Sequence, residues 1–440
     1  MNKAIFLYIL LISSINSKLN SKSSYDYSTY KSISENQALS GQTITSTSAD
    51  ESAVYITESI SIKNSNINKD SGDSTKMEDS ELYGVNSAVL VQGGNLVITG
   101  GQIASKAKGA NALYSTNDGV IVTSGTTITS TSSSISTLCA SFEGSIHLQS
   151  STVTSNGDSS PLALIEEEGS GIVFTDSTIS TDGEGSDLAM TLSQEYGSIR
   201  FVNTKGIAEK SRIGTIDGKS ALVIENQSEI KCSGSSIGNN VGECAILLYQ
   251  SGSKFNSGNS FSCKDSTFGI LESSTFYSTA IMFFVSNTGA NIQLTNCQLS
   301  YGSNTFIKVA AMEQWGEKGS NGGDAVIQLT NQNIEGDFLV DSDSKLYINL
   351  IKSNIKGKIN PDNTGKIVSI NIDRYSTITI TGNSYCLMIT NEIQDGSNLI
   401  NGTYSWTIGT PIIDNYAKGI FGNKLIILGL SLLLNILLLL

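Results

Sequence analysis

Histidine, proline and positive charge are all scarce in this sequence of 440 residues. It contains one histidine and three prolines, and 27 lysines and arginines stand against 40 aspartates and glutamates, for a net charge of −13. A single histidine disfavours a zinc site and leaves the usual catalytic triads without their base. The acidic balance argues against nucleic acid, which needs a basic face. We therefore expect no metal, no cofactor and no nucleic acid, and the scarcity of proline favours extended strands.

The first 17 residues have the features of a secretory signal peptide. Lys3 provides a basic start, an apolar run follows from Ala4 to Ile12, and the small residue Ser17 offers a cleavage point. The apolar run is too short to span a membrane comfortably. We predict a signal peptide over 1–17 and a lead-in or N-terminal cap over 18–45.

Residues 425–440 form a second apolar segment, interrupted only by a few small or polar residues. Together with the linker over 411–424, it resembles the signal for attachment of a glycosylphosphatidylinositol (GPI) anchor, with Ala417 or Asn415 as the attachment residue. A plain membrane anchor is the alternative, although a spanning helix needs about 20 residues. We expect passage through the secretory pathway and attachment to the outer leaflet of the plasma membrane.

Two kinds of covalent modification fit a secreted chain. Its six cysteines are even in number, and an oxidising compartment permits disulfide bonds. We expect pairing among the four that lie close in sequence, with buried free thiols as the alternative: Cys232, Cys244, Cys263 and Cys297. Asn226 and Asn401 begin Asn-X-Ser/Thr sequons and are candidate N-glycosylation sites in a eukaryotic cell.

One short line of sequence recurs along the chain. The lines NLVITGGQI, VIVTSGTTI, SIHLQSSTV and GIVFTDSTI end at Ile103, Ile128, Val153 and Ile179, so the period is about 25 residues. Within each line, apolar and polar residues alternate, which is typical of a strand with one face inward. We predict that Leu96 and Ile98 point inward and that Val97 points outward.

A second apolar run precedes each line and ends in a turn, as in NSAVLVQGG and SPLALIEEEG. One unit is therefore strand, turn, strand, turn and a short third segment. Such a unit cannot bury its own apolar face, but stacked units can, because each strand then bonds to the same strand of the next unit. We predict an all-β, single-stranded, right-handed parallel β-helix over 46–410. Two stretches break the pattern, the polar insert 68–83 and the glycine-rich excursion 312–324.

Several stretches resemble a family of large, secreted, adhesin-like proteins that is common in bacteria. They include SADESAVYI, SELYGVNSAVLVQGGNLVITGG, ILLYQSGS, WGEKGSNGG and GDFLVDSDSKLYINL, and the likeness covers about 45–410. The family is of the pectin-lyase-like β-helix class, so the resemblance implies this fold and a surface location. The lipid-attachment signal is a departure from the bacterial members.

Polysaccharide-active enzymes share this fold class, but their catalytic patterns are missing from the sequence. The lone histidine, His147, stands in an outward column without the glycine neighbours of polygalacturonase-like enzymes. Carboxylates cluster in EEE (166–168) and in TDGEGSD (Asp182, Glu184 and Asp187), and we interpret both clusters as solvated turn residues. An acid–base pair is the alternative for either cluster, and a calcium site is a further alternative for TDGEGSD. We predict no catalytic residue.

The aromatic residues Trp315, in the glycine-rich excursion, and Tyr249 are instead candidate contacts for a sugar; packing within the protein is the alternative for both. We expect an adhesin-like or coat protein, tethered to the membrane, that binds or displays without catalysis. Its partners would be extracellular glycans or other cells. The alternatives are a polysaccharide lyase or hydrolase and a purely structural wall or cyst protein.

Overall fold

The computed structural model describes residues 25, 28–33, 38–167, 171–192, 196–238, 241–252, 255–389 and 407–408. The predicted signal peptide, Asn401, the lipid-attachment residues Asn415 and Ala417, and the apolar segment 425–440 all lie outside the described residues. Within the described residues, no helix has the length and apolar character needed to cross a membrane.

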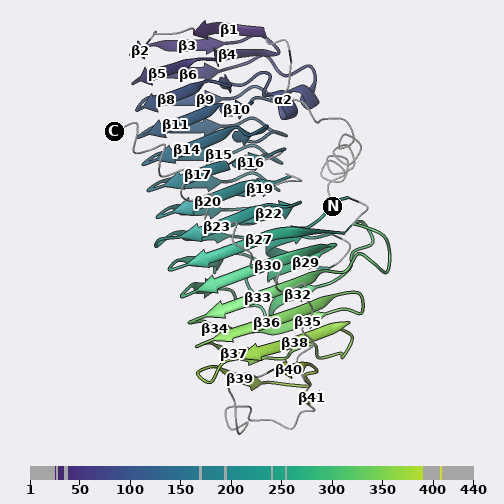
Figure 1. Cartoon of the computed structure of the whole chain (residues 1–440). Helices are drawn as coiled ribbons and strands as arrows, with labels where there is room; N and C mark the ends of the chain where they lie inside the picture. Colours follow the sequence, from purple (N-terminus) through teal and green to yellow (C-terminus); the bar gives the residue numbers. More distant parts are fainter. Residues whose placement is uncertain are drawn as a thin grey trace.

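The described chain is a right-handed parallel β-helix, as predicted from the repeat. Each complete coil contributes one strand to each of three long sheets, and the strands stack in one elongated column (Figure 1). Along each sheet, a strand pairs in parallel with the equivalent strand of the next coil, for example Ile121 with Ile146. The repeat of about 25 residues in the sequence is therefore one turn of the chain around the axis.

Sheet A contains β1 (Ser28–Ile33), β4 (Glu51–Ile56), β7 (Val89–Gln92), β10 (Leu113–Thr116), β13 (Leu138–Ala140), β16 (Ala163–Ile165), β19 (Ala189–Thr191), β22 (Gly214–Asp217), β26 (Glu243–Tyr249), β29 (Ile281–Ser286), β32 (Thr305–Val309) and β35 (Asp337–Val340). The short strand β25 (Ser235–Ser236) pairs with β26 in antiparallel fashion.

Sheet B contains β2 (Leu39–Ser40), β5 (Ser59–Lys63), β8 (Asn95–Thr99), β11 (Val120–Ser124), β14 (Ser145–Gln149), β17 (Gly171–Thr175), β20 (Ser198–Val202), β23 (Ala221–Glu225), β27 (Asn256–Lys264), β30 (Thr288–Thr295), β33 (Asp324–Thr330), β36 (Lys345–Ile351), β38 (Ile367–Ile372), β40 (Leu387–Ile389) and β41 (Thr407–Ile408).

Sheet C contains β3 (Thr43–Ser46), β6 (Asn66–Lys69), β9 (Gln102–Ser105), β12 (Thr127–Ser130), β15 (Thr152–Ser155), β18 (Thr178–Thr181), β21 (Lys205–Ala208), β24 (Glu229–Cys232), β28 (Thr267–Ile270) and β31 (Gln298–Ser300). A three-stranded sheet D continues on the same side with β34 (Asn333–Glu335), β37 (Asn354–Gly357) and β39 (Thr377–Ile380).

The core consists of apolar columns that run along the axis. One inward column of sheet B is Ile60, Leu96, Ile121, Ile146, Ile172, Ile199, Leu222, Phe261, Ile292, Ile327, Ile348 and Ile370, and all of these side chains are buried. Leu96 and Ile98 are buried, whereas Val97 between them is 40% exposed. The predicted alternation is confirmed, because successive side chains of a strand point to opposite faces.

The turn between sheets B and C, which we name the B–C corner, has the same backbone shape in twelve successive coils. The residue directly after each of the first twelve sheet B strands, β2 to β36, has a positive φ: Gly41, Asn64, Gly100, Gly125, Ser150, Asp176, Asn203, Asn226, Asp265, Asn296, Asn331 and Lys352. Glycine, asparagine and aspartate predominate because they tolerate this left-handed conformation best. Ser150 and Lys352 are the exceptions, at φ 48° and φ 49°.

Sheet A is buried on both of its faces along much of its length, which the sequence analysis did not predict. Its outward column includes Leu90, Tyr114, Cys139, Leu164, Leu247 and Phe284, all buried. Part of the polar insert 68–83 forms the helix α2 (Met77–Tyr83) over this face, where the Tyr114 hydroxyl donates to the Glu81 carbonyl at 2.6 Å. Near-continuous apolar runs are typical of strands buried on both faces.

Candidate functional site

Tyr249 and Trp315, the two predicted sugar contacts, are packed inside the protein. Their exposed fractions are 2% and 3%, and their ring centroids lie 4.4 Å apart. Tyr249 belongs to the outward column of sheet A, and the glycine-rich excursion brings Trp315 over it to cover apolar side chains of that face. The Asn321 side chain holds the excursion by donating to the carbonyls of Met312 and Trp315, both at 2.7 Å. This is the packing alternative, and it corrects the sugar-contact prediction because neither ring presents a face to a ligand.

The carboxylates of Asp182 and Asp187 in TDGEGSD do not point to a common site. Asp182 is exposed and pairs with Lys210 at 3.0 Å, whereas Asp187 is buried and accepts hydrogen bonds from Ser211 and Thr215. Asp187 also lies 3.7 Å from the guanidinium of Arg212. Across the part of the chain that the structure describes, no group of three or more histidine, cysteine or acidic residues could hold a metal ion.

The other candidate acids and bases are partly or fully buried. Glu166 is 5% exposed, and burial, with Glu81 and Glu167 nearby, raises its pKa well above the usual value. The third residue of this run, Glu168, lies outside the described residues. His147 is on the outward side of β14, as predicted, but it is half-buried, and burial lowers its pKa.

One disulfide joins two of the four cysteines that lie close in sequence. Cys263 and Cys297 are bonded, with their Cα atoms 6.3 Å apart, and they join β27 to the B–C corner of the next coil. Cys232 and Cys244 are instead buried free thiols. Burial raises their pKa values to about 12 and about 11, so both remain protonated and unreactive near neutral pH. Cys139 and Cys386 are also free.

Asn226, the described glycosylation candidate, is exposed at the B–C corner after β23, at φ 56°. Its position leaves the side-chain amide accessible to solvent. The hydroxyl of the sequon's Ser228 is buried and accepts a hydrogen bond from the Thr204 N–H at 3.0 Å. Modification of Asn226 stays a prediction.

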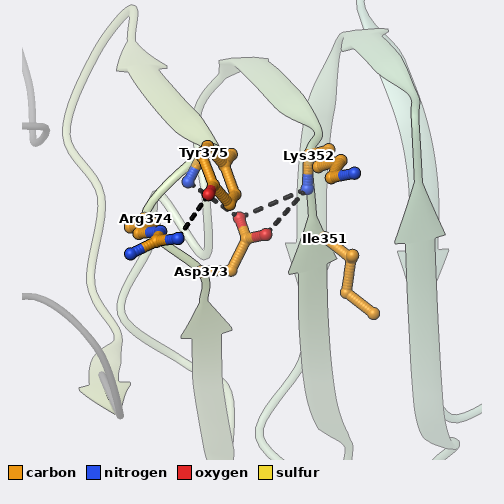
Figure 2. A pocket seen from close by; sticks show the side chains of 5 residues that line it. All are labelled: Ile351, Lys352, Asp373, Arg374 and Tyr375. Carbon is orange, nitrogen blue, oxygen red and sulfur yellow. Dashed lines mark hydrogen bonds between the residues drawn. The ribbon is translucent and has the colours of Figure 1, made fainter.

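The best candidate site is a shallow pocket at the last two B–C corners, with a volume of about 640 Å³. It is lined by Ile351, Lys352, Asp373, Arg374 and Tyr375, which Figure 2 shows from close by. Ile351 is the last residue of β36 and Lys352 follows it, whereas the other three residues follow β38. Ile351 is 40% exposed and Tyr375 is 58% exposed, so an aliphatic and an aromatic side chain both face solvent here.

A longer corner places Arg374 and Tyr375 at the surface. Leu350 pairs with Ile372, and the N–H of Ser353 donates to the Ser376 hydroxyl at 2.9 Å. Two residues stand between Leu350 and Ser353, but three stand between Ile372 and Ser376. The coil of β38 therefore has one extra corner residue, which must project because the strands on either side remain in register.

The Asp373 carboxylate stabilises this longer corner. In the preceding coil, the corner N–H of Asn331 donates to the Ile351 carbonyl at 3.1 Å. At Lys352 the equivalent N–H donates to the two carboxylate oxygens of Asp373, at 3.2 and 3.1 Å (Figure 2). The same carboxylate accepts from the Tyr375 N–H at 3.2 Å and from the Ser376 hydroxyl at 2.5 Å. Asp373 is thus occupied by structural hydrogen bonds, and it is the one carboxylate among the described residues that line the pocket.

Two cations surround the Tyr375 ring. The guanidinium carbon of Arg374 lies 4.7 Å from the ring centroid and the Lys352 ammonium lies 6.0 Å from it, both within range of a cation–π interaction. Arg374 also donates to the Tyr375 hydroxyl, and Figure 2 shows its guanidinium turned toward that oxygen. The site therefore offers an aromatic ring, several N–H donors and positive charge to a ligand.

The sequence analysis missed this pocket. It assigned no role to Arg374 or to Tyr375. Two signals were nevertheless present in the sequence: DRYS replaces the usual short corner, and Lys352 stands where asparagine or glycine recurs in other coils.

The chain matches no family model, no curated protein and no solved structure. The parallel β-helix is established by the strand pairing alone. The resemblance to adhesin-like proteins stays a prediction.

Proposed function

We propose that this chain is a non-catalytic β-helix protein, adhesin-like in role, that is held at the cell surface and binds glycans. The pocket around Tyr375 is the observation that carries this proposal. A solvent-facing aromatic ring flanked by fixed N–H donors is the usual means of holding a sugar, because the ring packs on apolar C–H groups and the donors bond to hydroxyls. The described lining of the pocket contains one carboxylate, that of Asp373, and its hydrogen bonds to the backbone fit a role in binding more than in hydrolysis.

The fold is suited to display. Its stacked coils form a rigid column whose outward sheet B residues are largely polar in the last coils, for example Gln293, Gln328 and Asn349. Each coil hydrogen-bonds to its neighbours along every sheet, so a site at a corner is held in a fixed geometry. A tethered protein of this shape would present the pocket to glycans of the surroundings or of other cells.

A glycan array probed with the full-length protein in detergent tests the proposal. We expect binding to a subset of glycans and its loss in Tyr375→Ala. Tyr196→Ala is the matched control, because Tyr196 is 64% exposed but lies on a different coil. Equal loss in both variants, or silence of the wild type across the array, would contradict glycan binding and favour a purely structural role. Release of reducing ends or unsaturated products from polysaccharides would contradict the non-catalytic part.

A further inference from the structure

We infer that the pocket around Tyr375 is one end of a longer binding surface, which holds an extended, linear, neutral saccharide along the axis of the β-helix. This inference rests on the proposed glycan-binding function and concerns the shape and the chemical class of the ligand. The surface is a column of amide side chains on the outward face of sheet B, which we name the amide column: Gln293, Gln328, Asn349 and Asn371.

The amide column leads directly to the pocket. Asn349 is two residues before Ile351, which lines the pocket, and residues two apart on a strand point to the same face at a separation of about 7 Å. In the next coil, Asn371 is two residues before Asp373. Successive members of the column lie on neighbouring coils, about 4.8 Å apart. One amide per coil therefore continues the line of the pocket along the axis.

The same position in the earlier coils shows that folding does not require an amide there. Valine predominates among the residues that precede the amide column in register: Val97, Val122, His147, Val173, Arg200, Val223 and Ser262. Valine fits a pleated, half-buried surface well, whereas asparagine is unfavourable in strands. Amides occur in this column only in the coils that end at the pocket, so they are best explained by contact with a ligand.

The side chains of the amide column do not bond one coil to the next. Elsewhere in the protein, stacked amides do so: the Asn354 side chain donates to Asn333 at 2.8 Å, and that of Asn296 donates to Asp265 at 2.8 Å. Within the part of the chain that the structure describes, the four side chains of the amide column make no such hydrogen bond, and all four are at least partly exposed. Each amide therefore offers donors and an acceptor to a ligand.

The chemistry of this face fits a neutral chain of sugars. Uncharged residues such as Val326 and Thr330 flank the amide column, and the charged pair at the start of its strands, Asp324 and Lys345, is joined at 2.8 Å. Amides donate to hydroxyls and accept from them, so they match a ligand that carries many hydroxyls and no charge. A linear saccharide presents hydroxyls at regular intervals, and it can therefore contact several coils at once.

Oligosaccharides of increasing length test the inference with the full-length protein. The probes are the di-, tetra- and hexasaccharides of cellulose, linear mannan and chitin, measured by isothermal titration calorimetry. We expect the hexasaccharide of at least one series to bind about tenfold more tightly than its disaccharide, because added hydrogen bonds to the amide column would provide that factor. The double variant Gln293→Val/Gln328→Val should remove this gain. It should leave the affinity for the disaccharide unchanged, because neither residue lines the pocket.

The outcomes separate this inference from the proposed function. The double variant should fold like the wild type, because valine occupies the same column in earlier coils. Gln149→Val, at an exposed position of sheet B on β14, is the control and should keep the gain with length. If length brings no gain, or if the double variant keeps the gain or the control loses it, the longer surface is wrong and glycan binding at the pocket stands. If no oligosaccharide binds, both are wrong.

Discussion

At the scale of single residues, the conformation of the B–C corners determines which side chains are exposed to solvent and available to a ligand. Lys352 occupies a backbone conformation that glycine or asparagine fills in most other coils, and the next corner is lengthened to project Arg374 and Tyr375. The core columns, in contrast, accept many aliphatic residues because each position requires only apolar volume. Ligand-binding residues are therefore expected at positions that differ from the residue type recurring at the same place in the other coils.

Substitution of Lys352 by asparagine should stabilise the protein. Asparagine tolerates the left-handed corner, so Lys352→Asn should raise the free energy of unfolding by about 1 kcal/mol. The reverse change one coil earlier, Asn331→Lys, should lower it by a similar amount. Urea denaturation of both variants provides the measurement. Unchanged midpoints in both would show that the corner imposes no strain on a lysine.

Asp217 should make stability depend on pH. It is 2% exposed, and burial raises its pKa from 3.8 to about 6, although hydrogen bonds such as that from the Ser251 N–H at 3.0 Å oppose the shift. The folded protein then binds the proton more tightly than the unfolded chain, so stability contributed by this group is greatest below about pH 4 and falls as the pH rises through about 6.

Asp217→Asn should therefore flatten the pH profile of stability. The expected difference between wild type and variant across pH 4–7 is at most about 3 kcal/mol, from a shift of roughly two units. Thermal unfolding at several pH values measures it, with the exposed Asp182→Asn as control. If the stability of wild type and of Asp217→Asn depends on pH in the same way, Asp217 has the same pKa in the folded and the unfolded protein. Buried Glu166, whose pKa is also raised, contributes in the same direction to both proteins.

At the scale of elements, hydroxyl groups join one coil to the next beside the B–C corner. Ser151, Ser177, Ser228 and Ser353 each accept a backbone N–H of the preceding coil, and each donates to a carbonyl of its own coil. These serines are buried. They satisfy N–H groups that the turn removes from the sheet ladders, which explains why serine and threonine recur after the corner residue.

Ser177→Ala should destabilise the protein through one lost hydrogen bond. The Ser177 hydroxyl accepts from the Ser151 N–H at 3.2 Å, and alanine would leave that buried donor without a partner. The expected cost is about 1–3 kcal/mol of the free energy of unfolding. Thr178→Ala, at the adjacent exposed position of β18, is the control and should change stability little. A similar loss in both variants would argue against a specific role for the hydroxyl.

At the scale of the whole molecule, the β-helix is a scaffold that holds a site near one of its ends. Sheet A is covered by α2 and by the glycine-rich excursion, which accounts for its apolar outward column. Sheet B carries the polar outward residues, and the pocket around Tyr375 lies beside it. The two stretches that break the repeat, 68–83 and 312–324, thus contribute to packing, whereas the candidate site depends on one extra corner residue.

The proposed tether should be sensitive to a specific lipase. Cells that display the full-length chain should release it after treatment with phosphatidylinositol-specific phospholipase C, because a GPI anchor holds proteins through that lipid alone. Release should be lost when Asn415 and Ala417 are both replaced by bulky residues. Retention of the wild-type protein on treated cells would contradict the GPI anchor and favour a plain membrane anchor.

The repeating alternation of the sequence was sufficient to predict the coils and the orientation of Leu96, Val97 and Ile98. It could do so because strand geometry is local and each coil must bury the same face. The environment of Tyr249 depended on tertiary structure, since a distant loop covers its face of sheet A. The pocket around Tyr375 also depends on tertiary structure. The extra corner residue after β38 can be identified only by comparison with the neighbouring coil, whose strands pair with it in register. Local periodicity thus determines the fold, whereas contacts between distant segments decide which side chains remain exposed to bind.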